Sequence, residues 1–204
     1  MLIVLTGIDG SGKTTAAEAI GAAARLAGID ALLLRNYAGR RRMSLTGAKL
    51  GVHLPPRLAD PIETAVRTFN VVNSHRRARR VPGLVVMDRH LHCQLALRVA
   101  QGLPRGRWLP WLIRTLPQPD LVLHLDVDPR EAHARVVARG TDSERLEDLV
   151  SLRDAYRSLP DFRRFTSIPA GGTPAEVLSR LQAAITIAGG SPAGGSRPAA
   201  AARL

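Results

Sequence analysis

Residues Met1-Leu-Ile-Val-Leu-Thr-Gly-Ile-Asp-Gly-Ser-Gly-Lys-Thr-Thr15 decide the fold of this chain. The short apolar run at residues 2–5 predicts a buried strand. It leads directly into Gly7-x-x-x-x-Gly12-Lys13-Thr14, the complete pattern of a phosphate-binding loop. Glycines let backbone N–H groups turn inward around an anion, and the helix that follows adds its positive N-terminal end. This stretch therefore predicts that the chain binds a polyphosphate.

The residue types of the loop suit a nucleoside triphosphate accompanied by a magnesium ion. Lys13 is expected to bridge the β- and γ-phosphates, and the Thr14 hydroxyl to bind Mg²⁺. The alternative is a glycine-rich turn between strand and helix that holds no ligand, which the complete pattern disfavours. The residues expected to bind ATP in this loop are Gly7, Gly10, Ser11, Gly12, Lys13, Thr14 and Thr15.

Length and composition fit a soluble globular protein. The chain has 204 residues, 45% of them hydrophobic, which allows one domain with a sizeable core. It shows neither a run of about 20 apolar residues, as a membrane span needs, nor the start of a signal peptide. The single cysteine, Cys93, fits a reducing compartment. We expect a cytoplasmic protein with a nucleotide-binding domain at residues 1–188 and a disordered tail at 189–204, where large apolar residues are few.

The net charge predicts an anionic partner. The chain has 29 lysines and arginines against 17 acidic residues, a net charge of +12. Surfaces that bind nucleic acids interleave basic with aromatic residues, but aromatic residues make up only 3% of this chain. The arginine clusters at residues 40–42 and 76–80 therefore favour a solvated surface or the rim of a phosphate site. A nucleic acid is not the expected partner, although residues 76–80 keep that alternative open.

Predicted strands and helices alternate along the chain. Short apolar runs predict strands at residues 2–5, 31–34, 84–87, 121–127 and 165–168. Asp60-Pro61-Ile62-Glu63 and Asp128-Pro129-Arg130-Glu131 each predict an N-cap followed by a helix. Helices are predicted at residues 14–27, 60–80, 91–101, 108–116, 129–139 and 143–158 and from 174 onward, with a short one near 44–52. This order predicts a three-layer α/β fold, with about five parallel strands and helices on both faces.

Several charged residues follow the predicted strands. In an open parallel sheet, ligands bind outside the carboxyl ends of the strands. There the Asp88 carboxylate can hold Mg²⁺ or orient the attacking group, or else cap the next helix. Arg89 offers a planar fork that matches a phosphate, although a single arginine is often only surface charge. We expect one cleft to contain the phosphate loop with Arg35, Asp88, Arg89 and Asp126.

Arginines also surround the segment at residues 140–143. A spacing of four places Arg135 and Arg139 on one helix face, and Arg145 follows the segment. Phosphoryl transfer needs positive charge on the migrating group, and a well-placed arginine raises its rate about 10³- to 10⁵-fold. We expect Arg135 to help bind ATP, and Arg139 and Arg145 to act in catalysis.

Four segments resemble successive motifs of thymidylate kinases over residues 1–185. They are Gly7-Ile-Asp-Gly-Ser-Gly-Lys-Thr-Thr15, Val86-Met-Asp-Arg-His90, Pro119-Asp-Leu-Val-Leu-His-Leu-Asp-Val-Asp-Pro129 and Arg139-Gly-Thr-Asp-Ser-Glu-Arg-Leu-Glu147. The resemblance implies a P-loop kinase fold that transfers the ATP γ-phosphate to dTMP beneath a small arginine-bearing lid at residues 139–146. The catalytic residues would be Lys13, Asp88, Arg89, Arg139 and Arg145, with Mg²⁺ on Thr14 and Asp88.

By the same resemblance, Asp9 would contact the sugar of the acceptor, Arg89 its phosphate, and Phe69 would stack on its base. Arg35 and Asn73 complete the expected acceptor site. Because the phosphate loop carries Ser11 and no arginine, the positive charge on the migrating phosphoryl group would come from the lid arginines.

The departures from the family motifs fall on the acceptor side. Thymidylate kinases usually carry Arg-Glu-Pro-Gly-Gly-Thr where this chain has residues 35–40, Arg-Asn-Tyr-Ala-Gly-Arg. Asn73 stands in place of a base-reading arginine, His90 in place of a tyrosine, and Leu97-Arg98 in place of tyrosine-glutamine. Two alternatives therefore stay open: a kinase for another nucleotide, nucleoside or small metabolite, and an inactive nucleotide-binding regulator. The oligomeric state is also open, with a homodimer among the options.

Other conspicuous residues have structural interpretations. His90 and His92 lack a third ligand at metal spacing and favour pocket residues over a zinc site. Cys93 is expected to be a small buried side chain. Trp108 and Trp111 are expected to pack in a helix.

Overall fold

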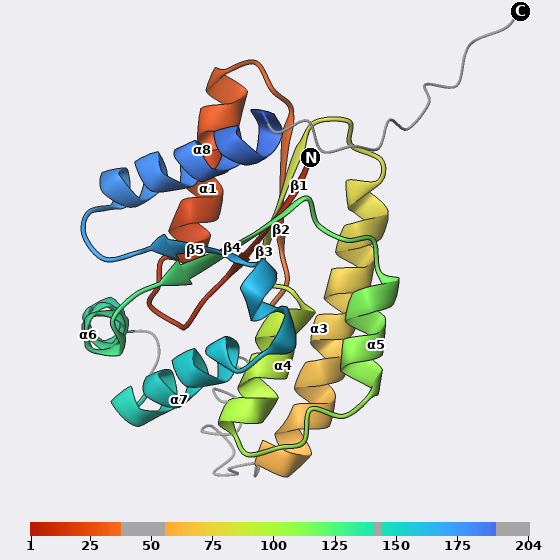
Figure 1. Cartoon of the computed structure of the whole chain (residues 1–204), viewed down its shortest axis with the longest axis vertical. Coiled ribbons are helices and arrows are strands. Elements are labelled where there is room, and N and C mark those ends of the chain that lie inside the picture. The colour runs from red at the N-terminus through yellow and green to blue at the C-terminus, as the bar shows by residue number, and fades with distance from the viewer. Residues whose placement is uncertain (38–55, 141–143, 191–204) are drawn as a thin grey trace, which may run out of the picture.

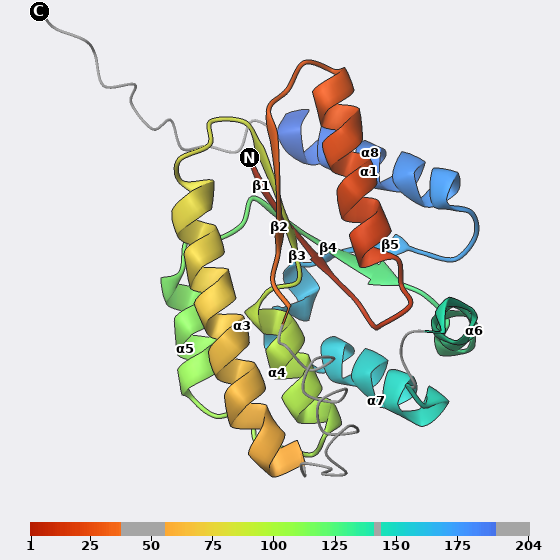
Figure 2. The same cartoon turned by 180° about the vertical axis from the view of Figure 1, so that it is seen from behind.

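The computed structural model describes residues 1–37, 56–140 and 144–190. A central sheet separates two groups of helices (Figure 1), and the view from behind shows the same division (Figure 2). Helices α1 (Lys13–Leu26) and α8 (Pro174–Gly190) pack together on one side of the sheet. Helices α3 (Pro56–Ala78), α4 (Leu91–Ala100) and α5 (Trp108–Thr115) cover the other side. Two further helices, α6 (Pro129–Arg139) and α7 (Leu146–Arg157), and the 3₁₀ helix η1 (Pro160–Arg164) complete the described elements.

The sheet has five strands, and every neighbouring pair is parallel. They are β1 (Leu2–Thr6), β2 (Ala31–Arg35), β3 (Leu84–Asp88), β4 (Leu121–Asp126) and β5 (Thr166–Pro169). Their order in the sheet is β2-β3-β1-β4-β5. This arrangement confirms the predicted three-layer α/β fold, with β1 and its phosphate loop at the centre.

Burial on both faces explains why the sequences of the central strands are continuous apolar runs. Ile3, Val4 and Leu5 are fully buried although their side chains point alternately to the two faces, because helices cover both faces.

The start of α6 is set as its sequence predicts: Asp128 Oδ1 accepts a hydrogen bond from the backbone N–H of Arg130 at 2.8 Å, and Pro129 follows the cap. Gly140 ends α6 in the left-handed conformation, with φ 63°.

The boundaries differ from the predictions in a few places. Helix α8 continues to Gly190, two residues into the segment predicted as a tail, and residues 191–204 lie outside the described part. The short helix predicted near residues 44–52 also lies outside it. The 3₁₀ helix η1 was not predicted. In the described ranges, no helix is both long enough and apolar enough to cross a membrane.

The predicted N-cap at Asp60 is wrong. Helix α3 begins at Pro56, so Asp60 lies inside it, and Pro61 is accommodated within the helix. The Asp60 carboxylate is only 6% exposed and forms an ion pair with Arg98 of α4. It also accepts a hydrogen bond from Gln94 Nε2 at 3.3 Å. A carboxylate in this position ties α3 to α4, and that tertiary role replaces the local one that the sequence pattern indicated.

Buried histidines fill the space between the sheet and the helices. His124 of β4 lies within hydrogen-bond distance of the Thr6 hydroxyl, at 3.1 Å, and its ring contacts Tyr156 and Phe162. Burial lowers the pKa of His124 to about 4. Burial also lowers the pKa of His75 and of His92 to about 4, because a buried imidazolium loses its hydration.

These lowered pKa values predict that acid destabilises the fold. A histidine with a pKa near 6.5 in the unfolded chain and about 4 in the folded protein binds more protons when unfolded, so the free energy of unfolding falls as the pH drops from about 6.5 to 4. One such histidine costs about 2 kcal/mol at pH 5 relative to pH 7. Urea unfolding at both pH values measures this loss. His124→Asn keeps a polar atom near Thr6 but cannot take up the proton. The fall in its free energy of unfolding between pH 7 and pH 5 should therefore be smaller than that of the wild type by about 2 kcal/mol. An equal fall in both proteins would contradict the lowered pKa of His124.

Candidate functional site

The phosphate loop connects β1 to α1 at the carboxyl end of the central strand. Three glycines give it its shape, with φ values of 139° at Gly7, 82° at Gly10 and 87° at Gly12. A Cβ atom at Gly10 would lie 2.3 Å from the carbonyl oxygen of Ala132 in α6. Glycine at this position is thus required both by the backbone conformation and by the close approach of α6.

Lys13 lies folded into the loop. Its side chain is almost fully buried, and Nζ donates a hydrogen bond to the Ile8 carbonyl oxygen at 2.5 Å. The Asp9 carboxylate lies 3.7 Å from the same ammonium group. Burial lowers the pKa of Lys13 and Arg89 lowers it further, while Asp9 acts in the opposite direction. The loop therefore holds a desolvated cation within its own turn.

Asp88 lies directly across from the start of α1. It is the last residue of β3 and is fully buried, and its Oδ2 accepts a hydrogen bond from the Thr14 hydroxyl at 2.7 Å. Its second oxygen, Oδ1, has no hydrogen-bond partner in the described part of the chain. A carboxylate oxygen left without a donor beside a threonine hydroxyl fits the ligand types that Mg²⁺ prefers. The two residues expected to bind the metal are thus brought together.

Arg89 follows Asp88 in a conformation that is rare for a residue with a side chain. Its φ is 77°, and its backbone is fixed on both sides: the N–H donates to the Leu5 carbonyl at 3.2 Å, and the carbonyl accepts from Asn36 Nδ2 at 2.8 Å. Strained backbone of this kind collects at functional sites. Asn36 was not predicted as a positioning residue, because its role depends on a contact between the end of β2 and the end of β3.

The Arg89 guanidinium forms an ion pair with Asp9. Burial lowers the pKa of Arg89, but the Asp9 and Asp88 carboxylates and other nearby groups together outweigh burial, so the net shift is upward. In turn, burial raises the pKa of Asp9, and Arg89 and Lys13 outweigh it in the opposite direction. Two cations, one from the loop and one from the end of β3, thus converge on one carboxylate. The expected residues Asp9, Lys13, Thr14, Asp88 and Arg89 form one connected site.

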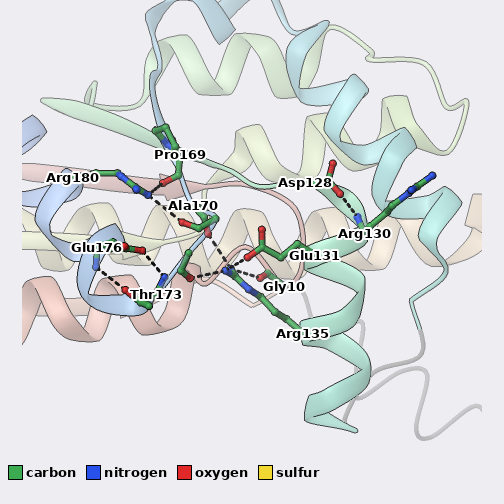
Figure 3. A network of polar contacts seen from close by, with 12 residues as sticks. Gly10, Asp128, Arg130, Glu131, Arg135, Pro169, Ala170, Thr173, Glu176 and Arg180 are labelled. Carbon is green, nitrogen blue, oxygen red and sulfur yellow. Dashed lines mark hydrogen bonds and ion pairs between the residues drawn. The ribbon is translucent and has the colours of Figure 1, made fainter.

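Arg135 joins α6 to two other segments of the site (Figure 3). Its guanidinium forms an ion pair with Glu131 at 2.6 Å and donates to the carbonyl oxygens of Ala170 at 3.1 Å and Gly172 at 3.2 Å. It also reaches the Gly10 carbonyl at 3.4 Å. The side chain expected to help bind ATP therefore lies against the phosphate loop and the segment between β5 and α8.

The arginines expected in the lid flank residues 141–143, which lie outside the described part of the chain. Arg139 is exposed at the end of α6. Arg145 precedes α7, is largely exposed and lies 3.3 Å from Glu147. Their catalytic roles stay predictions.

Among the described residues, the side chains of the others expected to bind the acceptor make no hydrogen bond or ion pair with this connected site, although Arg35 is the strand partner of Asp88. Arg35 pairs with Glu18 at the surface. Asn73 lines a pocket of about 350 Å³ between β2 and α3 together with Leu33, Leu34, Arg35, Asn70, Ser74 and Arg77. Phe69 is 70% exposed. The stacking of Phe69 on the acceptor base therefore stays a prediction.

Asp126, which was expected in the cleft, has a structural role. Its carboxylate accepts hydrogen bonds from Arg153 Nε at 2.8 Å and Arg157 Nη2 at 3.0 Å. Burial raises its pKa, but these two arginines outweigh burial and lower it. Asp126 thus anchors α7 to the end of β4.

Comparison with known proteins identifies relatives of the chain. The family model described as thymidylate kinase matches residues 5–180. A probable thymidylate kinase of Thermococcus onnurineus is 30% identical over 174 residues, covering 79% of this chain and 84% of that protein. A probable thymidylate kinase of Pyrococcus abyssi is 33% identical over 162 residues, covering 76% and 78% of the two chains. A thymidylate kinase of Ruegeria pomeroyi is 31% identical over 162 residues, covering 72% and 73%.

The loop geometry predicts unequal effects of alanine at two glycines. Gly10 and Gly12 both have positive φ, so an alanine at either costs about 1–2 kcal/mol of backbone strain. Only at Gly10 would the new Cβ also collide with the Ala132 carbonyl, because no atom lies within 4 Å of a Cβ at Gly12. Gly10→Ala should therefore lower the free energy of unfolding in urea by more than Gly12→Ala does. Equal losses would show that the approach of α6 does not constrain the loop.

Proposed function

The chain belongs to the thymidylate kinase family, and on this basis we propose that it transfers the γ-phosphate of ATP to dTMP, giving dTDP and ADP. Family membership makes it an ATP-dependent phosphotransferase. The observation that best supports the proposed transfer to dTMP is the contact between the phosphate loop and the end of β3. There Thr14 binds Asp88, and Arg89 pairs with Asp9. A kinase needs a triphosphate cradle, a metal site and a cation for the acceptor at one place, and this edge of the sheet supplies all three types of group.

The loop residues would bind the triphosphate of ATP. The backbone N–H groups of Gly7, Gly10, Ser11 and Gly12 would donate to the phosphates, and Lys13 would exchange its hydrogen bond to Ile8 for the β- and γ-phosphate oxygens. That exchange favours binding, because the buried ammonium group gains a stronger anionic partner. Thr15 continues the first turn of α1, whose N-terminus favours negative charge. Arg135 borders the same loop at Gly10.

Mg²⁺ would be held by the Thr14 hydroxyl and by Asp88, whose Oδ1 is available. When bound, it would neutralise charge on the phosphate oxygens. Thr14 and Asp88 are already in contact, so their own geometry needs little rearrangement to present two oxygens to one ion.

The acceptor would lie beside Asp9 and Arg89. The Arg89 guanidinium can bind its phosphate, and Asp9 can accept a hydrogen bond from its sugar. In this arrangement the acceptor phosphate would take the place that Asp9 now occupies on Arg89. Arg139 and Arg145 are the proposed source of positive charge on the migrating phosphoryl group.

A kinase for a different acceptor is the second candidate, and two observations favour it. Arg98, which replaces the glutamine usual in the family, is bound to Asp60, and Phe69 points into solvent. An acceptor panel separates the candidates by measuring ADP formation with dTMP, other nucleoside monophosphates and nucleosides. If ADP forms at the background rate with dTMP but rapidly with another acceptor, that acceptor replaces dTMP in the proposed reaction. ATP binding in calorimetry without turnover on any acceptor would favour an inactive regulator.

Lys13→Ala should reduce phosphoryl transfer at least about 100-fold, because it removes a preorganised cation from the phosphates of ATP. The fold should persist, since Lys13 bonds only to its own loop in the described structure. Single-turnover transfer and circular dichroism measure the two expectations. Arg130→Ala, which removes an exposed positive charge from α6, is the control and should transfer normally. Near-normal transfer by Lys13→Ala would refute the role of the loop.

A further inference from the structure

One buried cation near the site has two nitrogen atoms without a hydrogen-bond partner in the described residues. Arg67 of α3 is only 4% exposed, and its Nε and Nη1 atoms have no hydrogen-bond partner in the described part of the chain. A buried charge is costly unless it is paired, so nearly all buried guanidinium groups have carboxylates or carbonyls around them. An unsatisfied cation at such a position needs an explanation, and a ligand that arrives later is one.

The groups that shift the pKa of Arg67 include one carboxylate. Burial lowers its pKa, and the Arg89 guanidinium lowers it further, while the Cys93 thiol, the Tyr156 hydroxyl and Asp9 act in the opposite direction. Of these groups, only Asp9 is a carboxylate, and Asp9 is already paired with Arg89. The carboxylate that acts on Arg67 is therefore already engaged by a second guanidinium group.

The inner face of α3 is fixed against the segment that carries Arg89. Arg67, Val71, Ser74 and His75 are all buried, as their helical spacing allows. Ser74 donates a hydrogen bond to Asn36 Oδ1 at 2.7 Å, and Asn36 in turn binds the carbonyl oxygen of Arg89. His75 lies 3.1 Å from His90. These contacts hold the α3 face that carries Arg67 in a fixed position relative to Arg89.

Phe69 and Arg67 lie on different faces of the helix. Two residues along an α-helix correspond to about 200° of rotation, which agrees with an exposed Phe69 and a buried Arg67. The side chain that α3 directs toward the buried charges is therefore an arginine and not the aromatic ring that the motif comparison indicated. A guanidinium offers five N–H donors in a planar group and binds carbonyl and phosphate oxygens with defined geometry.

We propose that Arg67 binds an oxygen atom of the acceptor nucleotide, next to Arg89. This inference rests on the proposed function, which supplies the acceptor. An acceptor phosphate would give the two guanidinium groups the negative charge that they lack, and a base carbonyl would satisfy the unpartnered N–H groups of Arg67. Both sources present the same chemistry, an electron-rich oxygen, and the experiment separates them. Arg67 would thus determine specificity on the acceptor side, where the chain departs most from the family motifs.

The test measures the dissociation constants of dTMP, thymidine and ATP by calorimetry for the wild-type protein and for Arg67→Met. Methionine keeps much of the volume of the side chain and removes the charge. We expect dTMP to bind at least about tenfold more weakly, with ATP binding within twofold of wild type. Weaker binding of dTMP alone assigns the oxygen atom to the phosphate. Equally weaker binding of thymidine assigns it to the nucleoside. The midpoint of thermal unfolding should stay the same or rise, because an unpaired buried charge has been removed.

Two further variants control for folding and charge. Arg67→Lys keeps the charge but loses the planar fork, and its dTMP binding should fall between the wild type and Arg67→Met. Arg76→Met removes an exposed arginine from the same helix and should bind all three ligands normally. If a folded Arg67→Met variant binds dTMP as the wild type does, the inference about Arg67 is overturned while the proposed function stands. If the variant loses affinity for both ATP and dTMP and its melting temperature falls, Arg67 has a structural role instead. Failure of the wild-type protein to bind dTMP would remove the proposed reaction as well.

Discussion

The parallel pairing of β1 with β3 is the constraint on which the site depends. Its register places Leu5 opposite Asp88, so the phosphate loop and the Asp88-Arg89 pair leave the sheet at the same edge, although more than 70 residues separate Thr14 from Asp88 in sequence. The backbone N–H of Arg89 binds the Leu5 carbonyl and continues the sheet by one bond beyond the strand. A slip of one residue would turn the Asp88 side chain to the other face of the sheet and away from Thr14. The buried apolar side chains of both strands specify the register, and so the hydrophobic core fixes the position of the polar site.

Charge at this edge is unbalanced toward positive. Lys13 and Arg89 share the Asp9 carboxylate, Asp88 has an oxygen without a donor, and Arg67 is buried without a hydrogen-bond acceptor on two of its nitrogens. A folded protein tolerates such groups when the rest of the structure holds them in place. Here the Asn36 contacts, the Ser74 hydrogen bond and the packing of α3 supply that support. Under the proposed function, anionic substrates and a metal cation would satisfy these groups, and the binding energy would help to position the reacting groups.

Much of the fold and half of the site follow from local sequence patterns. The five strands, their parallel direction and the cap at Asp128 depend on apolar runs, strand-helix alternation and short-range hydrogen bonds, all of which a sequence displays. The phosphate loop is likewise a continuous motif, and the topology of a parallel sheet brings Asp88 and Arg89 to it. Lys13, Thr14, Asp88 and Arg89 were therefore predictable, because each belongs to a motif or ends a strand.

The remaining residues depend on contacts that no local pattern encodes. Asp60 has the spacing of an N-cap, yet its carboxylate binds Arg98 from a neighbouring helix, and a tertiary ion pair outweighs a local capping preference. Arg67 lies in a helix rich in arginines, and composition alone gives no reason to separate it from Arg76 or Arg77. What separates it is the helical period, because positions 67, 71, 74 and 75 form one buried face on which every other member is uncharged or has a polar partner. A buried arginine whose Nε and Nη1 have no hydrogen-bond partner in the described residues, and whose pKa responds to Arg89 and Asp9, is the combination that favours a binding group.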